Sequence, residues 1–284
     1  MLRTLTAVAV LGWTSMTPAG GLDSELKPAT TAAFDRYVRA AEARMDDEVR
    51  RADRFLYLDT RADGDRQRIE RSIRQGEVVV EPLEARERGK SIDIPDGRVH
   101  HWIGIAFVPG VHVNDAVGLL QDYDRHAEIY QPAVQRSKIL SRDGDRFKVF
   151  LRFYQKKVIS VTLNSEHDAE FVRVADRVYS RIRSTRIAEV ADAGTPSEHE
   201  KPVGQDGGFL WRLNTYWRFL ERGGGTYIQC ESITLTRDIP FGFGWLVKPF
   251  VTSIPRESLT FTMERTRQAL RKMPAGLPPD SDRN

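Results

Sequence analysis

The sequence predicts an α+β protein in which a curved antiparallel sheet is closed by one long helix near the C-terminus. After Pro132 the hydrophobic pattern takes a period of two and keeps it as far as Arg237, as expected of successive strands. Glycine-containing turns at 143–145 and 223–225 are compact enough to join neighbouring strands as hairpins, which makes the sheet antiparallel. The helical period returns over residues 253–272.

The composition is that of an ordinary globular protein, with 284 residues, 40% hydrophobic and 29% charged. The 43 Lys and Arg residues are interleaved with 40 Asp and Glu residues, which argues against a nucleic-acid-binding surface. A single cysteine, Cys230, excludes an internal disulfide and a metal centre built on several thiolates. The six histidines show no ligand spacing, so we expect neither a metal nor a cofactor.

Residues 1–21 have the pattern of a secretory signal. Arg3 supplies a positive flank, residues 5–13 form an apolar core, and residues 17–21 are small enough for a peptidase site. The apolar run is shorter than the roughly 20 residues that a membrane-spanning helix needs. We therefore expect export to the periplasm or the cell exterior; the alternative is a frayed N-terminus.

Residues 22–97 are expected to form an N-terminal helical extension that packs on the main domain. Apolar residues three or four apart predict an amphipathic helix over Thr30–Leu56, and alternating acids and bases predict a solvated outer face. A short helix over Asp65–Gln75 and a strand over Glu77–Glu81 follow. The polar stretch Arg86–Gly97 marks the boundary.

The main domain is expected over residues 98–273, followed by a tail at 274–284 whose Pro, Asp and Ser content predicts disorder. A strand over Arg98–Val108 is followed by two short helical stretches that end at Pro132. The strands predicted beyond Pro132 are Val134–Ser141, Arg146–Gln155, Val158–Ser165, Glu170–Arg173 with Tyr179–Val190, Phe209–Arg222 and Thr226–Arg237. The long C-terminal helix then covers the face that the curved sheet cannot fill, which leaves room for a cavity.

The strand Phe209–Arg222 separates aromatic from polar residues, as expected of a sheet with one face in water. One face carries Trp211, Leu213, Thr215, Trp217 and Phe219, and the other carries Arg212, Asn214, Tyr216 and Arg218. A hairpin turn at 223–225 would place Trp217 and Phe219 beside Glu231 and Gln229 of the next strand. The residues that we expect to bind a ligand are Trp211, Leu213, Trp217, Phe219, Gln229, Glu231, Ile233, Leu259 and Met263.

Glu231 leaves three interpretations open. It is a polar anchor in an apolar pocket, a general acid with a pKa raised by burial, or the ion-pair partner of an arginine such as Arg183 or Arg186. The segment with Phe241, Phe243 and Trp245 is similarly open, because its glycine spacers suit a gate, a transient contact with a membrane surface, or a tight bend that caps the core.

Two stretches resemble the START-like superfamily, also known as SRPBCC or helix-grip proteins. Residues 120–134 (LQDYDRHAEIYQPAV) are similar to the stretch that joins the two short helices to the second strand in that family. Residues 256–259 with 266–270 resemble the family's last helix, so that the resemblance covers residues 98–272. The family includes polyketide cyclases, coenzyme Q-binding proteins and lipid-transfer domains. The resemblance implies a helix-grip fold with a cavity for a lipid, isoprenoid or aromatic molecule.

The sequence favours a binding or transport protein for an apolar small molecule, with no catalytic residues. It has no nucleophile elbow, phosphate loop or dinucleotide fingerprint. His100 and His101 are neighbours on a strand and point to opposite faces, so we expect one in solvent and one packed. The alternatives are a cyclase or dehydratase in which Glu231 or Tyr216 moves protons, and a protein-interaction module of the cell envelope.

Overall fold

The computed structural model describes residues 24–157, 159–238 and 253–273. The signal-like segment 1–21, the tail 274–284 and the predicted gate residues Phe241, Phe243 and Trp245 lie outside these ranges. No helix among the described residues has both the length and the apolar character that a membrane crossing requires.

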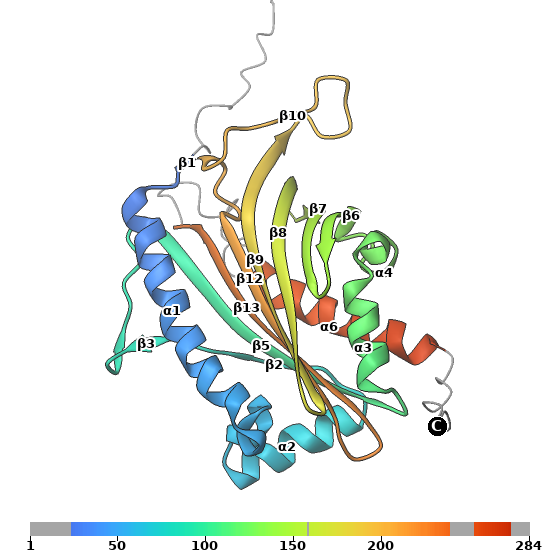
Figure 1. Cartoon of the computed structure of the whole chain (residues 1–284). Coiled ribbons are helices and arrows are strands. Elements are labelled where there is room, and N and C mark those ends of the chain that lie inside the picture. Colours follow the sequence, from blue (N-terminus) through green and yellow to red (C-terminus); the bar gives the residue numbers. More distant parts are fainter. Residues whose placement is uncertain (1–23, 158, 239–252, 274–284) are drawn as a thin grey trace, which may run out of the picture.

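A nine-stranded antiparallel sheet forms the centre of the molecule (Figure 1). Its consecutive strands pair as hairpins, and the last strand, β13, pairs with the early strand β5, so the predicted antiparallel arrangement is confirmed. In spatial order the strands are β2 (Val79–Pro82), β5 (Gly97–Pro109), β13 (Gly225–Arg237), β12 (Arg212–Glu221), β9 (Arg177–Ala191), β8 (Ser160–Val174), β7 (Arg146–Lys156) and β6 (Val134–Asp143), with β10 (His199–Glu200) paired to β9. Two short pairs lie outside the sheet, β1 (Ser24–Glu25) with β11 (Gln205–Asp206) and β3 (Arg86–Glu87) with β4 (Lys90–Ser91).

One predicted strand break does not exist. The two segments predicted at 158–165 and 170–173 belong to one continuous strand, β8. The polar run Glu166-His167-Asp168 interrupts the hydrophobic pattern in the sequence, yet His167 is buried and keeps its place in the ladder. Because a polar residue lies on the buried face, the hydrophobic pattern did not indicate that the strand is continuous.

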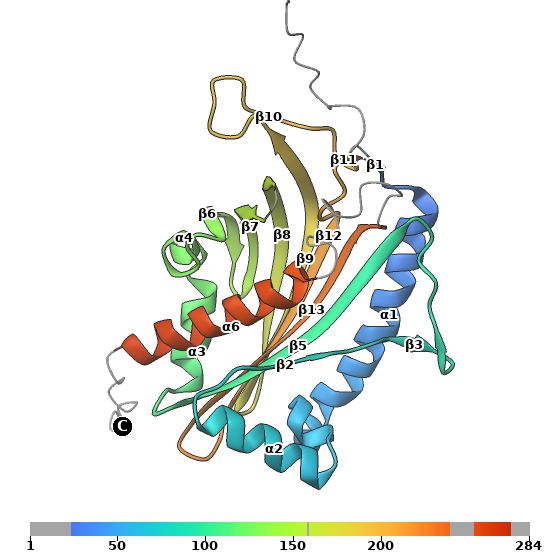
Figure 2. The same cartoon turned by 180° about the vertical axis from the view of Figure 1, so that it is seen from behind.

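The helix α6 (Ile254–Lys272) crosses one face of the sheet, as Figure 2 shows. Pro255 lies in its first turn, where the missing N–H costs no hydrogen bond. The apolar face of α6 packs into a large core with the sheet and with α3 (Val113–Gln121). The short helix α4 (His126–Ile129) follows α3 and leads into β6. A curved antiparallel sheet with one long helix across it is the predicted α+β helix-grip fold, which is confirmed.

Gly104 on β5 sets how closely α6 approaches the sheet. A Cβ atom at this position would lie 2.9 Å from Cγ of Met263 and 3.4 Å from Cγ of Leu259. Gly104→Ala is therefore expected to lower the free energy of unfolding by about 1–3 kcal/mol through overpacking. The matched control is Gly118→Ala in α3, where a Cβ meets nothing within 4 Å and helix propensity predicts a gain of about 0.5–1 kcal/mol. Urea denaturation of both variants measures the difference; equal effects would contradict the close contact.

The opposite face of the sheet is covered by α1 (Pro28–Arg50), as Figure 1 shows. Its apolar stripe includes Phe34 and Met45 and packs on Trp211, Ile233 and Leu235 of the main domain. The prediction of a solvent-exposed face for the strand at 209–222 is therefore wrong, since even Arg218 is only 2% exposed. The apolar stripe of an amphipathic helix has to be buried somewhere, and here it is buried on the second face of the sheet.

The rest of the N-terminal segment covers the part of the same face that lies at the bottom of Figure 1. The helix α1 ends at Arg50, before the predicted Leu56, and two 3-10 turns follow at Ala52–Arg54 and Tyr57–Thr60. With α2 (Asp63–Arg74) these turns bury a second core against β5 and β13. The chain then enters the sheet itself, because β2 pairs with β5 as an edge strand.

The turn of the β12–β13 hairpin is one residue longer than predicted, which shifts the pairing of the two strands by one residue. The turn has four residues, Arg222–Gly225, and is closed by a hydrogen bond from the Arg222 N–H to the Gly225 carbonyl at 2.9 Å. Trp217 therefore lies opposite Cys230 instead of Glu231. Because side chains alternate along a strand, a slip of one residue moves the whole set to the other face. Gln229, Glu231 and Ile233 thus point toward the N-terminal elements instead of α6.

Candidate ligand-binding cavity

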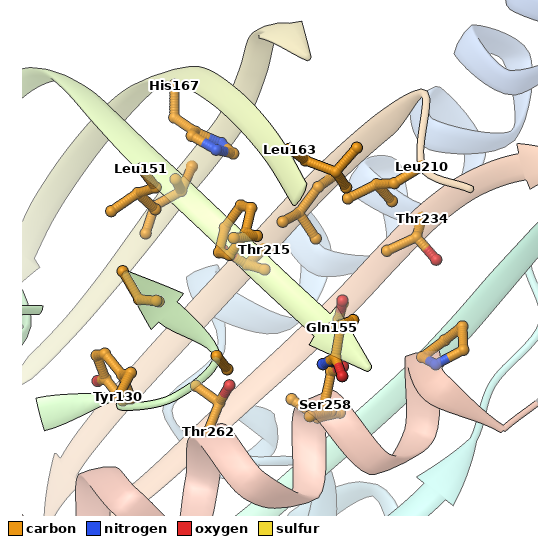
Figure 3. A pocket seen from close by; sticks show the side chains of 18 of the residues that line it. Tyr130, Leu151, Gln155, Leu163, His167, Leu210, Thr215, Thr234, Ser258 and Thr262 are labelled. Atoms are coloured by element: carbon orange, nitrogen blue, oxygen red, sulfur yellow. The ribbon is translucent and has the colours of Figure 1, made fainter. Parts of the chain in front are cut away.

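A cavity of about 230 Å³ lies between the sheet and α6 (Figure 3). Strands β7, β8, β12 and β13 supply one wall, and α4 and α6 supply the other. For comparison, an engineered cavity of about 150 Å³ in another protein holds benzene. The lining includes no Asp, Glu, Lys or Arg among the described residues. The space therefore suits an uncharged, mainly apolar molecule.

Four large side chains of the same core lie outside the lining of the cavity. Phe147 and Phe171 pack with their ring centroids 5.9 Å apart in an edge-on arrangement. Phe219 and Met263 are fully buried in the same core. This core also contains the lining residues Trp217 and Leu259, so the cavity adjoins a packed region.

The nine predicted ligand-binding residues divide into three groups. Leu213, Trp217 and Leu259 line the cavity. Phe219 and Met263 lie on the same side of the sheet but belong to the packed core and not to the lining. The four that lie away from the cavity, on the face covered by α1 and the turns after it, are Trp211, Gln229, Glu231 and Ile233.

Lining residues on β6, β7, β8, β9 and β13 were not predicted from the sequence. On β13, the correct hairpin register brings Cys230, Ser232 and Thr234 to the cavity. These positions follow from the sequence when the hairpin turn is taken as the four residues 222–225 instead of the three glycines 223–225. On β7 and β8 the cavity is lined by Leu151, Phe153, Val161, Leu163 and His167. No short-range signal marks them as different from other buried strand residues.

Three buried polar atoms in the lining have no hydrogen-bond partner among the described residues. They are the Tyr123 hydroxyl, Nδ1 of His167 and Oγ1 of Thr234. Buried polar groups are almost always paired with protein or with ordered water. These atoms are therefore positions at which a bound molecule can place its own polar groups.

The other titratable groups in the cavity are held in their uncharged forms. Burial lowers the pKa of His126 to about 4, and its Nε2–H donates to the Leu120 carbonyl at 3.0 Å. Burial raises the pKa of Tyr130 to about 12, and its hydroxyl bonds to that of Thr266 at 2.9 Å. Burial also raises the pKa of the Cys230 thiol. The cavity therefore presents no thiolate and no charged acid or base near neutral pH.

Glu231 lies in an ionic cluster on the opposite face of the sheet. Its side chain is 1% exposed and accepts hydrogen bonds from His101 Nε2, at 2.6 Å, and from Arg44 of α1. The same helix supplies Glu48, which bonds to Arg218 at 2.7 Å. The ion-pair interpretation of Glu231 is therefore correct, although the arginine is Arg44.

The residues that the sequence suggested as partners for Glu231 are engaged elsewhere. Arg183 bonds to Glu42, at 2.9 Å through Nε, and Arg186 bonds to Glu200. The expectation that one of the two adjacent histidines faces solvent is wrong, because both are buried. His101 bonds to Glu231 under α1, and His100 bonds to Thr236 at 3.1 Å. Within 24–157, 159–238 and 253–273, no cluster of His, Cys, Asp and Glu could hold a metal ion.

Comparison with known proteins found similar chains among solved structures. No family model and no curated protein matches the chain. Among solved structures, it is similar to a STAR-related lipid transfer protein from Xanthomonas axonopodis, with 14% identity over 68% of this chain and 99% of that one and a TM-score of 0.44. It is also similar to the Zhui aromatase/cyclase from a Streptomyces species (15% identity, 63% and 98% coverage, TM-score 0.42) and to human STARD10 (11% identity, 76% and 82% coverage, TM-score 0.44).

Proposed function

We propose that the protein binds and carries an uncharged apolar small molecule in the cavity between the sheet and α6. The observation that carries this proposal is an apolar cavity whose described lining has no charged side chain and includes three buried polar atoms without a partner in the described part of the chain. Burial of apolar ligand surface gains about 2.5 kcal/mol per 100 Å², so a molecule of modest size needs no ionic contact. Lipids, isoprenoids and aromatic compounds all meet these requirements.

The structure bears on the two alternative functions, a cyclase-type enzyme and a protein-interaction module. The proposed acids of a cyclase, Glu231 and Tyr216, both lie on the side of the sheet away from the cavity, where Tyr216 donates to Glu42 at 2.8 Å. Both side chains are bonded to residues of α1 on that side, so the structure does not favour them as the groups that move protons in a cyclase. An interaction module based on the first helix is not favoured either, because the apolar stripe of α1 is already buried. Export, and brief contact with a membrane surface during ligand exchange, remain part of the proposal.

Purification from the native host tests the proposal directly. We expect native mass spectrometry to show a non-covalent adduct that organic solvent removes. The emptied protein should then bind the uncharged probe N-phenyl-1-naphthylamine saturably at one site, with a change in tryptophan fluorescence because Trp217 lines the cavity. Failure to find either an adduct or saturable binding would contradict the proposal.

A further inference from the structure

We infer that the cavity selects ligands that carry a hydroxyl group, because His167, which lines the cavity, has a buried acceptor nitrogen without a partner among the described residues. The inference rests on the proposed function and narrows its ligand class. Among apolar molecules it favours alcohols and phenols over carboxylates and ethers. His167 lies on β8, is 1% exposed and lines the cavity opposite α6 (Figure 3).

A chain of two hydrogen bonds determines which nitrogen of His167 carries the proton. The hydroxyl of Ser165 donates to the Leu151 carbonyl at 3.0 Å, and a carbonyl oxygen can only accept. A serine hydroxyl has one proton, so at its other contact the Ser165 oxygen must accept. That contact is Nε2 of His167 at 2.9 Å, which is therefore the N–H of the ring.

The ring is neutral, so its other nitrogen has a free lone pair. Burial lowers the pKa of His167 to about 4, and no carboxylate in the described lining would stabilise a charged ring. In the neutral ring with Nε2 protonated, Nδ1 is an acceptor only. This Nδ1 is buried and has no partner among the described residues.

The strand geometry holds this acceptor in place. Ser165 and His167 are two residues apart on β8 and share the face toward the cavity. The register shift in the β8–β9 pairing beside His167 comes from an extra residue on β9, Thr185, so β8 itself keeps its regular alternation. The ring of Phe153 meets His167 edge-on, with centroids 6.2 Å apart. The acceptor is therefore fixed before a ligand arrives.

An unpaired acceptor distinguishes ligands by whether they can donate a proton. An alcohol or phenol donates to Nδ1, whereas the corresponding methyl ether cannot. A carboxylate brings a negative charge into a cavity whose described lining offers no cation. The unpaired Tyr123 hydroxyl lines the same cavity and can donate to a ligand oxygen, which again suits a hydroxyl group.

Three small probes of similar shape test the inference: 1-naphthol, 1-methoxynaphthalene and 1-naphthoate. Calorimetric titration of the emptied full-length protein at pH 7 should give a Kd for 1-naphthol about tenfold lower than that for the ether. Naphthoate should bind more weakly than either. In His167→Phe the preference for naphthol over the ether should fall to about one, through weaker naphthol binding. The matched control His199→Phe replaces an exposed histidine on β10 that is not among the lining residues and should keep the tenfold ratio.

Equal binding of naphthol and ether by the wild type, or an unchanged ratio in His167→Phe, would overturn the inference while leaving the proposed function intact. Absence of binding by all three probes would instead count against the proposed function. If His167→Phe does not fold, the ratio of the Kd values for naphthol and ether measured on the wild type still tests the inference. A long-range proton–nitrogen NMR spectrum should show His167 protonated at Nε2, with an Nδ1 signal that shifts when naphthol is added. A ring protonated at Nδ1 would refute the assignment.

Discussion

Glu231→Ala is expected to lower the free energy of unfolding by about 1–3 kcal/mol, because it leaves the buried Nε2–H of His101 without its acceptor and removes one of the carboxylate partners of Arg44. Arg44 and His101 bond directly to this carboxylate, and the carboxylate is 1% exposed. Chemical denaturation at pH 7 measures the loss. The control is Glu128→Ala in α4, whose carboxylate is 68% exposed and pairs with Arg125; its removal should leave the unfolding free energy nearly unchanged.

The loss should depend on pH in a defined direction. Burial tends to raise the pKa of Glu231, but the hydrogen bond from His101 and the charges of Arg44 and Arg218 outweigh it, so the pKa lies below its usual value. A lowered pKa in the folded state contributes stability above the unfolded pKa of about 4.3, and this contribution disappears as the pH falls through the folded value. The difference between wild type and Glu231→Gln should therefore be largest near neutral pH and shrink in acid. A constant difference from pH 7 to pH 3 would contradict the ionic account.

Thr215→Trp is expected to weaken probe binding by at least about a hundredfold, or about 2.7 kcal/mol, while the fold is kept. Thr215 on β12 points into the cavity (Figure 3), and an indole ring at this position occupies the space that a ligand needs. The cavity gives the larger side chain somewhere to go, so overpacking should be small. Titration with N-phenyl-1-naphthylamine measures the change.

The matched control is the same exchange at Thr185 on β9, which is exposed. Thr185→Trp should bind the probe as the wild type does, and both variants should give a wild-type circular dichroism spectrum. Unchanged binding in Thr215→Trp would mean that the probe binds elsewhere.

The elements of the fold could largely be predicted from the sequence because each has a local cause. The period of two after Pro132 depends on neighbouring residues alone, and so does the helical stripe of α6. The hairpin register at 222–225 could not be derived in the same way, because three successive glycines permit turns of different lengths. One residue of uncertainty there changed the side of the sheet on which Glu231 lies.

The cover provided by α1 could not be predicted, for a different reason. An amphipathic stripe shows that a helix packs on something but does not show on what. The alternating acids and bases of α1 predicted a solvated outer face, whereas several of its acids bond to strand arginines far away in sequence: Glu42 to Arg183, Asp46 to Arg181 and Glu48 to Arg218. The role of His167 depends likewise on the pairing of β7 with β8, which brings Leu151 opposite Ser165.

A crystal of the protein soaked with 4-bromo-1-naphthol tests the central claim most directly, because anomalous scattering locates the bromine without ambiguity. The account predicts a bromine peak between α6 and the sheet, in contact with Trp217 and Leu259, with the naphthol oxygen near His167. Side chains filling that space, or a bromine bound only on the outer surface, would contradict it.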